Sequence, residues 1–348
     1  MNNKPKWLKL TALFALFSGV FFIAHIFGRS EIGVAAKTEV PTGDQDVVFG
    51  RGSGAHDSFA IMPDFESPPS IEPNDLIYDP ARNTVPIVNE EYNVVFFLVA
   101  KAASSEWIRF FMRLNSSPFW CVDGVHKKTH KGLKFLSDYS IEEATEMMTS
   151  KDWTRAIFVR NPKPRILSAF LDKAVSHKDG FIRDKCPIYA ARGGDYDECV
   201  ERREDFSFFL YNITTTLSKN VHWRSIYSRV DEKWWPWMNY VANMEALSDD
   251  AEHFLKSLKS NIDGASAWDR IGRTGWSDNE RDCDDLGDSA FLAKKDSKHK
   301  TNAKDQLRQY YTPELEKFVE THYANDFNNP YFHFTEVELY DDKEEEFD

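Results

Sequence analysis

After residue 90, apolar and polar residues alternate in the pattern of short buried strands followed by amphipathic helices. Residues 93–99, NVVFFLV, form one apolar run rich in β-branched and aromatic side chains, which is typical of a buried strand. A short loop follows, and then EWIRFFMRL places apolar residues at helical spacing, namely Trp107, Phe110, Phe111 and Leu114. The pattern predicts a strand–loop–helix unit.

A second unit of the same kind follows later in the chain. Residues 155–159, RAIFV, read as another buried strand, and Arg160 stands at its end. Pro164 sits where a first helical position is expected, and the predicted helix runs to Lys173. The repetition of the unit favours strands that lie parallel in one sheet.

Two further helices are predicted from their first residues. Ser140 and Glu143 have the spacing of a capping box, for a helix through Met148. Thr312 and Pro313 begin PELEKFVETHY, which has acidic residues in its first turn. Alternating strands and helices predict an α/β fold with a central, mostly parallel sheet flanked by helices.

The N-terminus carries the longest apolar run, residues 8–27, with Lys4, Lys6 and Lys9 on its N-terminal flank. About 20 apolar residues suffice to cross a bilayer as a helix. The positive flank favours a cytosolic tail at 1–6, a signal-anchor at 7–27 and a lumenal remainder. A cleaved signal peptide is the alternative, although the small residues at 34–36 lie well beyond the run. Both put the chain in the secretory route.

The rest of the chain divides by composition. Residues 28–89 are rich in Gly, Pro, Ser and acidic residues without a period, which predicts a stem or linker. A folded domain is predicted at 90–335 and an acidic tail at 336–348. The 348 residues are 42% hydrophobic, as in globular proteins, and carry a net charge of −13. That charge gives no overall attraction to nucleic acid, so none is expected as a partner.

The four cysteines are Cys121, Cys186, Cys199 and Cys283. They contain no CxxC pair, so a zinc site is not expected. An even number is compatible with disulfides in an oxidising lumen, and Cys186 and Cys199 bracket a Gly-rich loop that a bridge would staple. Four free thiols remain the alternative.

The first candidate site is the loop Ala100–Ser105, AKAASS, between the first strand and its helix. Backbone N–H groups at a helix start bind phosphate, and small side chains let the anion approach them. Ser104 and Ser105 add hydroxyl donors, and Lys101 can place positive charge on a leaving oxygen. The pattern is not a Walker motif. A polar turn with a solvated lysine is the alternative.

The second candidate site combines Arg160, Arg165 and Ser168. Arg160 ends a strand, where open α/β sheets bind their ligands. A guanidinium group offers a planar fork that matches phosphate oxygens. A surface arginine and a helical serine would explain each residue alone, but two such turns in one chain suit a nucleotide with phosphates at both ends.

These residues carry a resemblance to a known family. VAKAASSEW is similar to the 5′-phosphosulfate loop of the Golgi carbohydrate sulfotransferases (sulfotransferase family 2), the group with the chondroitin 4-O- and HNK-1-type enzymes, and RAIFVRNPKPRILSAFLDK is similar to their 3′-phosphate segment. VHWRSIYSRVD, YVANMEALSDDAEHFL and YYTPELEKFVETHYANDF also fit, in the family's order. The resemblance covers residues 92–334.

The resemblance implies a P-loop-like sulfotransferase domain, the donor 3′-phosphoadenosine 5′-phosphosulfate (PAPS), no metal, a carbohydrate acceptor and the Golgi membrane. The 5′ end of the donor would be held by Lys101, Ala102, Ala103, Ser104, Ser105 and Glu106. Arg160 and Ser168 would hold its 3′-phosphate. The chain departs from the family at Ser104, Glu106 and Asn161, where Cys, Asn and Asp are common.

An acceptor hydroxyl must lose its proton, and His or Glu commonly accepts it. His126 is the first candidate base and His130 the second, because related uronyl 2-O-sulfotransferases are thought to use a His from this stretch. Both would otherwise be surface residues. His222 could contact donor or acceptor or lie in the core, and Glu106 is a further candidate or a helix-dipole partner.

A basic stretch, a tryptophan cluster and two glycosylation sequences each allow more than one interpretation. The basic stretch could hold an anionic glycan or be a solvated face, and comprises His126, Lys127, Lys128, His130, Lys131 and Lys134. The cluster Trp234, Trp235 and Trp237 fits a core, with a sugar-stacking platform as the alternative. Asn212-Ile213-Thr214 is a possible glycosylation acceptor in the lumen, and Asn115-Ser116-Ser117 is a weaker one.

Three rival functions follow. A nucleotide kinase would need a Walker glycine pattern, which the chain lacks. A non-catalytic lumenal glycan-binding protein on the same fold would bind a glycan without turning over a donor. A protein-tyrosine sulfotransferase would differ from the main prediction in its acceptor.

Overall fold

The computed structural model describes residues 68–82, 84–120, 132–271, 274–276, 289–291, 301–335, 337 and 339, all within one compact unit, His56–Asp348. None of the helices in these ranges is long and apolar enough to cross a membrane. The predicted signal-anchor, residues 7–27, lies outside the described residues.

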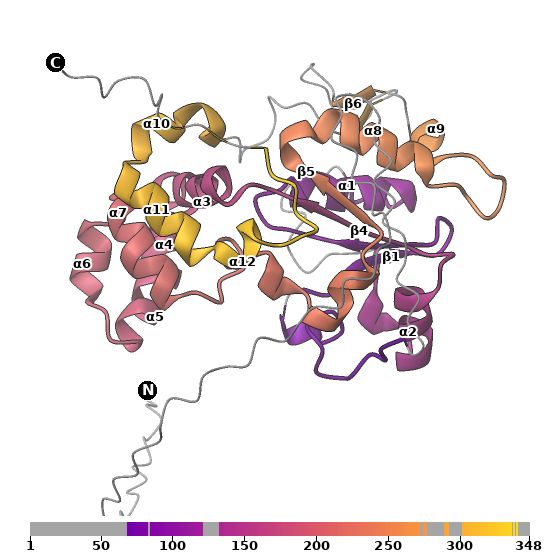
Figure 1. The fold of residues 1–348 in the computed structure, drawn as a ribbon, viewed down its shortest axis with the longest axis horizontal. Coiled ribbons are helices and arrows are strands. Elements are labelled where there is room, and N and C mark those ends of the chain that lie inside the picture. The colour runs from indigo at the N-terminus through magenta and orange to yellow at the C-terminus, as the bar shows by residue number, and fades with distance from the viewer. Residues whose placement is uncertain are drawn as a thin grey trace, which may run out of the picture. The chain divides into compact units, whose positions relative to one another are not determined.

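A five-stranded sheet forms the centre of the domain, in the order β3-β1-β2-β4-β5 (Figure 1). Its strands are β1 (Ile87–Asn89), β2 (Val94–Phe97), β3 (Lys134–Phe135), β4 (Thr154–Val159) and β5 (Tyr240–Asn243). β2, β4 and β5 run parallel, whereas β1 is antiparallel to both β2 and β3. The prediction of a mostly parallel sheet is confirmed, and the two predicted strands are direct neighbours.

Helices cover both faces of this sheet (Figure 1). On one face lie α1 (Ser104–Leu114), α8 (Leu247–Ser257) and α9 (Ala267–Ile271), and on the other lie α2 (Ile141–Thr149) and the 3₁₀ helix η6 (Glu232–Trp237). The α1 face is an aromatic core in which Trp107 packs on Phe158 with ring centroids 4.5 Å apart and on Phe96 at 4.7 Å. The core fixes α1, and with it the loop that precedes it.

A cluster of helices extends from the end of β4 (Figure 1). Its members are α3 (Pro162–Phe170), the π-helix η3 (Leu171–Ser176), α4 (Lys178–Asp184), α5 (Cys186–Ala191), α6 (Tyr196–Glu201), α7 (Phe206–Phe208), the π-helix η4 (Phe209–Thr214), α10 (Leu307–Tyr310) and α11 (Pro313–His322). The remaining described elements are α12 (Ala324–Phe327), the 3₁₀ helices η1 (Pro80–Arg82), η2 (Leu136–Asp138), η5 (Tyr227–Arg229), η7 (Met244–Ala246) and η10 (Ala303–Gln306), and the paired strands β6 (Thr274–Trp276) and β7 (Ser289–Phe291).

Two boundaries differ from the sequence prediction. Residues 68–89 belong to the domain rather than to a linker: they include β1, and Ile77 is fully buried at 0% exposure. Their few apolar positions stand among chain breakers, so no period revealed them. The helix expected from Pro164 begins at Pro162, because the Asn161 side chain accepts a hydrogen bond from the Lys163 N–H at 3.0 Å and caps it.

Other local predictions are confirmed. Ser140 and Glu143 form the predicted capping box of α2, and Thr312 caps α11. Trp234, Trp235 and Trp237 are all buried in the core on the α2 face of the sheet. The sugar-platform alternative for these tryptophans is therefore wrong, because no indole face is open to a ligand.

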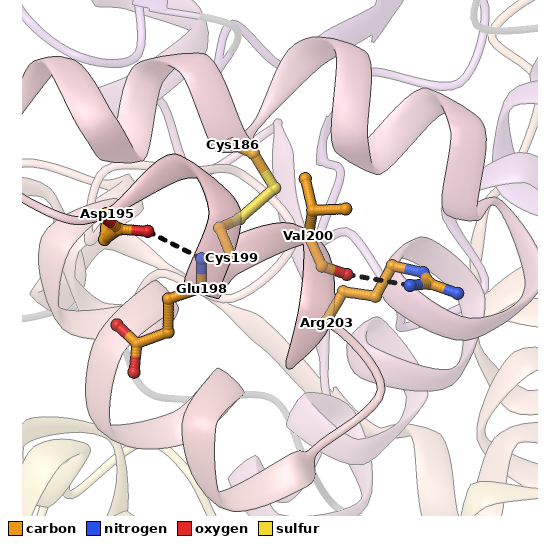
Figure 2. Close-up of a disulfide and its surroundings, with 6 residues drawn as sticks. All are labelled: Cys186, Asp195, Glu198, Cys199, Val200 and Arg203. Carbon is orange, nitrogen blue, oxygen red and sulfur yellow. Dashed lines mark hydrogen bonds between the residues drawn. A yellow bond between two sulfur atoms is a disulfide. The ribbon is translucent and has the colours of Figure 1, made fainter.

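Cys186 and Cys199 form a disulfide that joins α5 to α6, with their Cα atoms 5.6 Å apart (Figure 2). The turn between these helices needs glycine at Gly194, where a Cβ atom would lie 2.2 Å from the Tyr189 ring. Asp195 then caps α6 by accepting a hydrogen bond from the Glu198 N–H at 2.7 Å (Figure 2). Cys121 and Cys283 lie outside the described residues.

Candidate active site

The loop between β2 and α1 turns through two left-handed residues, Lys101 with φ 69° and Ala103 with φ 57°. Such angles are uncommon for residues other than glycine, and they produce the sharp reversal that starts the helix. Ala103 is the N-cap of α1, and its methyl group cannot satisfy the first backbone N–H groups of the helix. The loop therefore presents a helix N-terminus at the carboxyl edge of the sheet.

The Lys101 ammonium is buried against a carboxylate. Its Nζ lies 2.9 Å from Asp172 Oδ2, and the two side chains are only 9% and 3% exposed. The same carboxylate contacts Lys173 Nζ at 3.0 Å and His177 Nδ1 at 3.0 Å. Asp172 lies on the π-helix η3, and such local widening of a helix is frequent at functional sites.

Two opposing effects set the protonation of Lys101. Burial lowers its pKa, because a charged group loses solvation, and the neighbouring Asp172 carboxylate raises it. Lys173 and Arg160 add smaller contributions that lower the pKa. Asp172 is therefore the group that favours the charged form of Lys101.

Arg160 joins the two predicted donor segments. It follows β4 and donates a hydrogen bond from Nη1 to the carbonyl oxygen of Lys101 at 2.9 Å. Burial lowers the pKa of Arg160 to about 10, and Glu245 opposes the shift. Because β2 and β4 are parallel neighbours, their carboxyl ends meet here, as the sequence predicted.

Ser168 is buried on α3 and accepts a hydrogen bond from the Thr301 hydroxyl at 3.0 Å. Thr301 was not predicted as a site residue, because a threonine in a polar stretch has no recognisable sequence pattern. The contact brings a segment 133 residues away in sequence to the second candidate site.

The Arg165 side chain is fully buried and bonds to the backbone of the 222–224 segment. Its side chain is 0% exposed and donates to the carbonyl oxygens of His222 at 3.4 Å and Arg224 at 2.7 Å. Asp326 lies 3.8 Å away as its counter-charge. The guanidinium therefore holds the 222–224 segment in place, while its buried Nε atom has no hydrogen-bond partner among the described residues.

His222 lies near Lys101 and Lys173. Burial, reinforced by these two cations, lowers the pKa of His222 to about 3, so the imidazole is neutral at physiological pH. Its Nδ1 atom is buried and has no hydrogen-bond partner among the described residues. The sequence left open a core position or contact with donor or acceptor, and the structure places His222 at a partly buried position near Lys101.

Of the basic stretch, which includes the two histidines predicted as bases, the structure describes only Lys134. His126 and His130 lie in the range 121–131, outside the described residues, with Lys127, Lys128 and Lys131. Lys134, the last of the basic stretch, is exposed and paired with Glu90. Among the described residues, no group of three or more His, Cys, Asp or Glu side chains is arranged to hold a metal ion.

The chain is similar to several carbohydrate sulfotransferases. Carbohydrate sulfotransferase 9 of Homo sapiens is 25% identical over 184 residues, 49% of this chain and 40% of the relative. Carbohydrate sulfotransferase 11 of Rattus norvegicus is 24% identical over 185 residues, 49% of this chain and 51% of the relative. Carbohydrate sulfotransferase 14 of Danio rerio is 27% identical over 184 residues, 49% and 47% of the two chains. The chain thus spans about half the length of these relatives or less.

No solved structure matches this chain at a significant level. The sequence pattern of the sulfotransferase family, in contrast, matches residues 86–334, which contain the whole sheet, the Lys101 loop and the Arg160 segment. With that match, the chain belongs to the sulfotransferase family.

Proposed function

We propose that the chain transfers a sulfuryl group from PAPS to a hydroxyl group of a carbohydrate acceptor. The observation that carries this proposal is the pairing of the two donor segments through the Arg160–Lys101 hydrogen bond, with the Lys101 ammonium buried beside them. The names of the relatives, all carbohydrate sulfotransferases, support the choice of acceptor class.

The side chains present fit such a donor. An ammonium, a guanidinium and hydroxyl groups at a helix N-terminus are the groups that bind phosphate and sulfate oxygens in proteins. We assign Lys101 and residues 102–106 to the 5′ end of the donor, and Arg160 with Ser168 to its 3′-phosphate. The Thr301 hydroxyl, which donates a hydrogen bond to Ser168, is a further candidate ligand of the 3′-phosphate.

PAPS supplies an activated sulfuryl group whose departure leaves negative charge on a phosphate oxygen. Lys101 stabilises that charge, and its effect is strong because the site is buried and solvent reorganises little around it. Asp172 keeps the ammonium protonated and holds it in place until a stronger anion competes for it. These proposed roles of Lys101 and Asp172 involve no metal ion.

A base must accept the proton of the acceptor hydroxyl. We assign this role to His126, with His130 as the second candidate. His222 is a weaker base, because its pKa of about 3 leaves little driving force for proton transfer at neutral pH. Replacing each histidine by glutamine and measuring kcat against pH would identify the base: its loss removes the acidic limb of the profile, whereas loss of a binding residue changes KM.

We propose a single-pass type II protein of the Golgi membrane with its catalytic domain in the lumen. The apolar run at residues 8–27 and its lysine flank support the anchor. The Cys186–Cys199 disulfide supports a lumenal domain, because structural disulfides persist in oxidising compartments.

A radiolabelled-donor assay separates the candidate functions. The full chain is incubated with sulfur-labelled PAPS, a panel of glycans and polysaccharides, and tyrosine peptides. Label transfer to a glycan supports the proposal, and transfer only to tyrosine identifies a protein-tyrosine sulfotransferase. Glycan binding without donor binding or transfer would instead identify a non-catalytic glycan-binding protein.

A further inference from the structure

Two arginines next to the Lys101 loop carry buried nitrogen atoms that nothing in the described part of the chain satisfies. Arg229, the last residue of η5, donates from Nη2 to the carbonyl oxygen of Leu98 at 2.6 Å, while its Nη1 has no partner. Arg224 leaves both Nε and Nη2 buried without a hydrogen-bond partner. Buried guanidinium groups in proteins are normally paired or hydrogen-bonded.

The charges around these two arginines are also positive. Arg165 and Arg82 act on Arg224, and Arg224 and Arg165 act on Arg229. Burial and these cations lower the pKa of Arg229 to about 9 and that of Arg224 to about 10. Within the described ranges, no carboxylate is among the groups that shift the pKa of either arginine. Within the described part of the chain, this positive charge therefore has no carboxylate beside it, and an uncompensated buried charge is costly.

The segment that carries both arginines is held in place. Arg165 donates to the carbonyl oxygen of Arg224 at 2.7 Å. Asp326 accepts hydrogen bonds from the Ser225 hydroxyl at 2.5 Å and from the Ile226 and Tyr227 N–H groups at 2.9 Å. The backbone between the two arginines is therefore fixed, and the Arg229 guanidinium is also held by its hydrogen bond to the Leu98 carbonyl oxygen.

Contacts of the segment that carries Arg224 and Arg229 connect it to the candidate active site. Leu98, the anchor of Arg229, directly follows β2 and lies three residues before Lys101. His222, whose electrostatic neighbours include Lys101, lies two residues before Arg224 on the same segment. Arg229 therefore lies at the end of β2 that leads into the Lys101 loop, and Arg224 is among its electrostatic neighbours.

We propose that Arg224 and Arg229 form an oxyanion-binding site beside the Lys101 loop. This inference rests on the proposed function, which supplies two sources of oxyanions: the phosphate and sulfate groups of the donor, and acidic substituents of the acceptor. Arginine suits both, since its planar fork binds phosphate, sulfate and carboxylate oxygens in pairs.

The first test uses inorganic sulfate as the probe, on the full chain. Arg224→Met removes a partly buried cation whose Nε and Nη2 atoms make no hydrogen bond within the described residues. In sodium chloride, we expect its melting temperature to equal or exceed that of wild type. In sodium sulfate of equal ionic strength, we expect the variant to lose the sulfate-specific part of the wild-type increase.

A matched control separates binding from the general stabilising effect of sulfate on proteins. Arg192→Met removes an exposed arginine whose Nη1 donates to the Thr216 carbonyl oxygen, and it should keep the full sulfate increase. The inference is overturned if Arg224→Met is less stable than wild type in chloride and retains the same sulfate increase.

The second test identifies the source of the oxyanion. Arg224→Met and Arg229→Lys are compared with wild type for binding of adenosine 3′,5′-bisphosphate by calorimetry, and for the KM of the acceptor found with labelled donor. Loss of about tenfold or more in nucleotide affinity assigns the site to the donor. Unchanged nucleotide affinity with a KM raised about tenfold assigns it to the acceptor.

If both quantities stay unchanged in both variants, the inference fails although the proposed function stands. If wild type itself binds no nucleotide, the proposed function fails, and the sulfate measurement still decides whether the oxyanion site exists.

Discussion

At the scale of single residues, the Asp172 carboxylate organises the candidate site. It is almost fully buried and contacts three groups that can carry positive charge, Lys101, Lys173 and His177. A buried carboxylate without such partners would be strongly disfavoured, and so would the Lys101 ammonium without Asp172. The ion pair therefore favours a charged lysine inside the protein.

Asp172→Asn tests this role through the pH dependence of activity. Asp172 raises the pKa of Lys101 against the effect of burial, so its loss lowers that pKa further. The ammonium form is then lost at a lower pH, and the alkaline limb of kcat/KM should move to lower pH. The measurement is the pH profile of sulfuryl transfer from mildly acidic to alkaline buffer.

His177→Gln is the control for this variant. Its ring also contacts Asp172, but half of the side chain is exposed and the Lys101–Asp172 pair stays intact. Its alkaline limb should match that of wild type. An unchanged limb in Asp172→Asn as well would contradict the electrostatic role of Asp172.

The residues of the site were predictable from sequence only in part. Lys101 and Arg160 stood at strand ends in βα turns, which is where chemistry is expected, and the structure brings them together. Asp172 and Thr301 were not found, because a helical aspartate and a loop threonine have no local signature. Arg165 was predicted as a ligand, and its contacts with the Arg224 carbonyl oxygen and Asp326 could be seen only in three dimensions.

At the scale of secondary structure, the strands and helices with strong patterns were predicted well. The apolar runs became β2 and β4, and the Ser140 capping box began α2. β1 was missed, because its three residues, Ile87–Asn89, are too short for a period. The two π-helices, η3 and η4, were missed because their widening depends on tertiary packing.

The turn between α5 and α6 gives a prediction at this scale. Gly194→Ala would place its Cβ 2.2 Å from the Tyr189 ring, which is itself buried against Phe208. The ring must shift, so we expect a loss of about 1–3 kcal/mol in the free energy of unfolding, measured by urea denaturation.

Gly180→Ala in α4 is its counterpart, since the nearest atom to a Cβ there is a flexible arginine terminus at 3.9 Å. Alanine is the better helix former, so this variant should gain up to about 1 kcal/mol. Equal effects of the two substitutions would refute the steric explanation.

At the scale of the whole molecule, the C-terminal part of the chain supports the site. Asp326 on α12 is fully buried and binds the backbone of the 225–227 segment, about 100 residues earlier in the chain. It also provides the counter-charge of Arg165. These contacts fix the segment carrying His222, Arg224 and Arg229, and Arg229 in turn bonds to the Leu98 carbonyl oxygen before the Lys101 loop.

Asp326→Ala should therefore reduce both stability and activity. Removing one partner of a buried pair leaves the other charge uncompensated, at a cost of about 3–5 kcal/mol in the free energy of unfolding. Asp305→Ala, at an exposed position on η10, should change stability by less than about 0.5 kcal/mol. Denaturant unfolding of both variants checks the difference, and a similarly small effect at Asp326 would contradict its role as the support of this segment.

In the proposed reaction, Lys101 stabilises the leaving group of the sulfuryl transfer. The most direct measurement is the rate of transfer from labelled PAPS to the acceptor, at saturating donor, for wild type, Lys101→Ala and Lys219→Ala, which removes an exposed lysine. We expect Lys101→Ala to lower kcat by about 100-fold or more, and Lys219→Ala to leave it unchanged. A Lys101→Ala rate within about twofold of wild type would contradict the account.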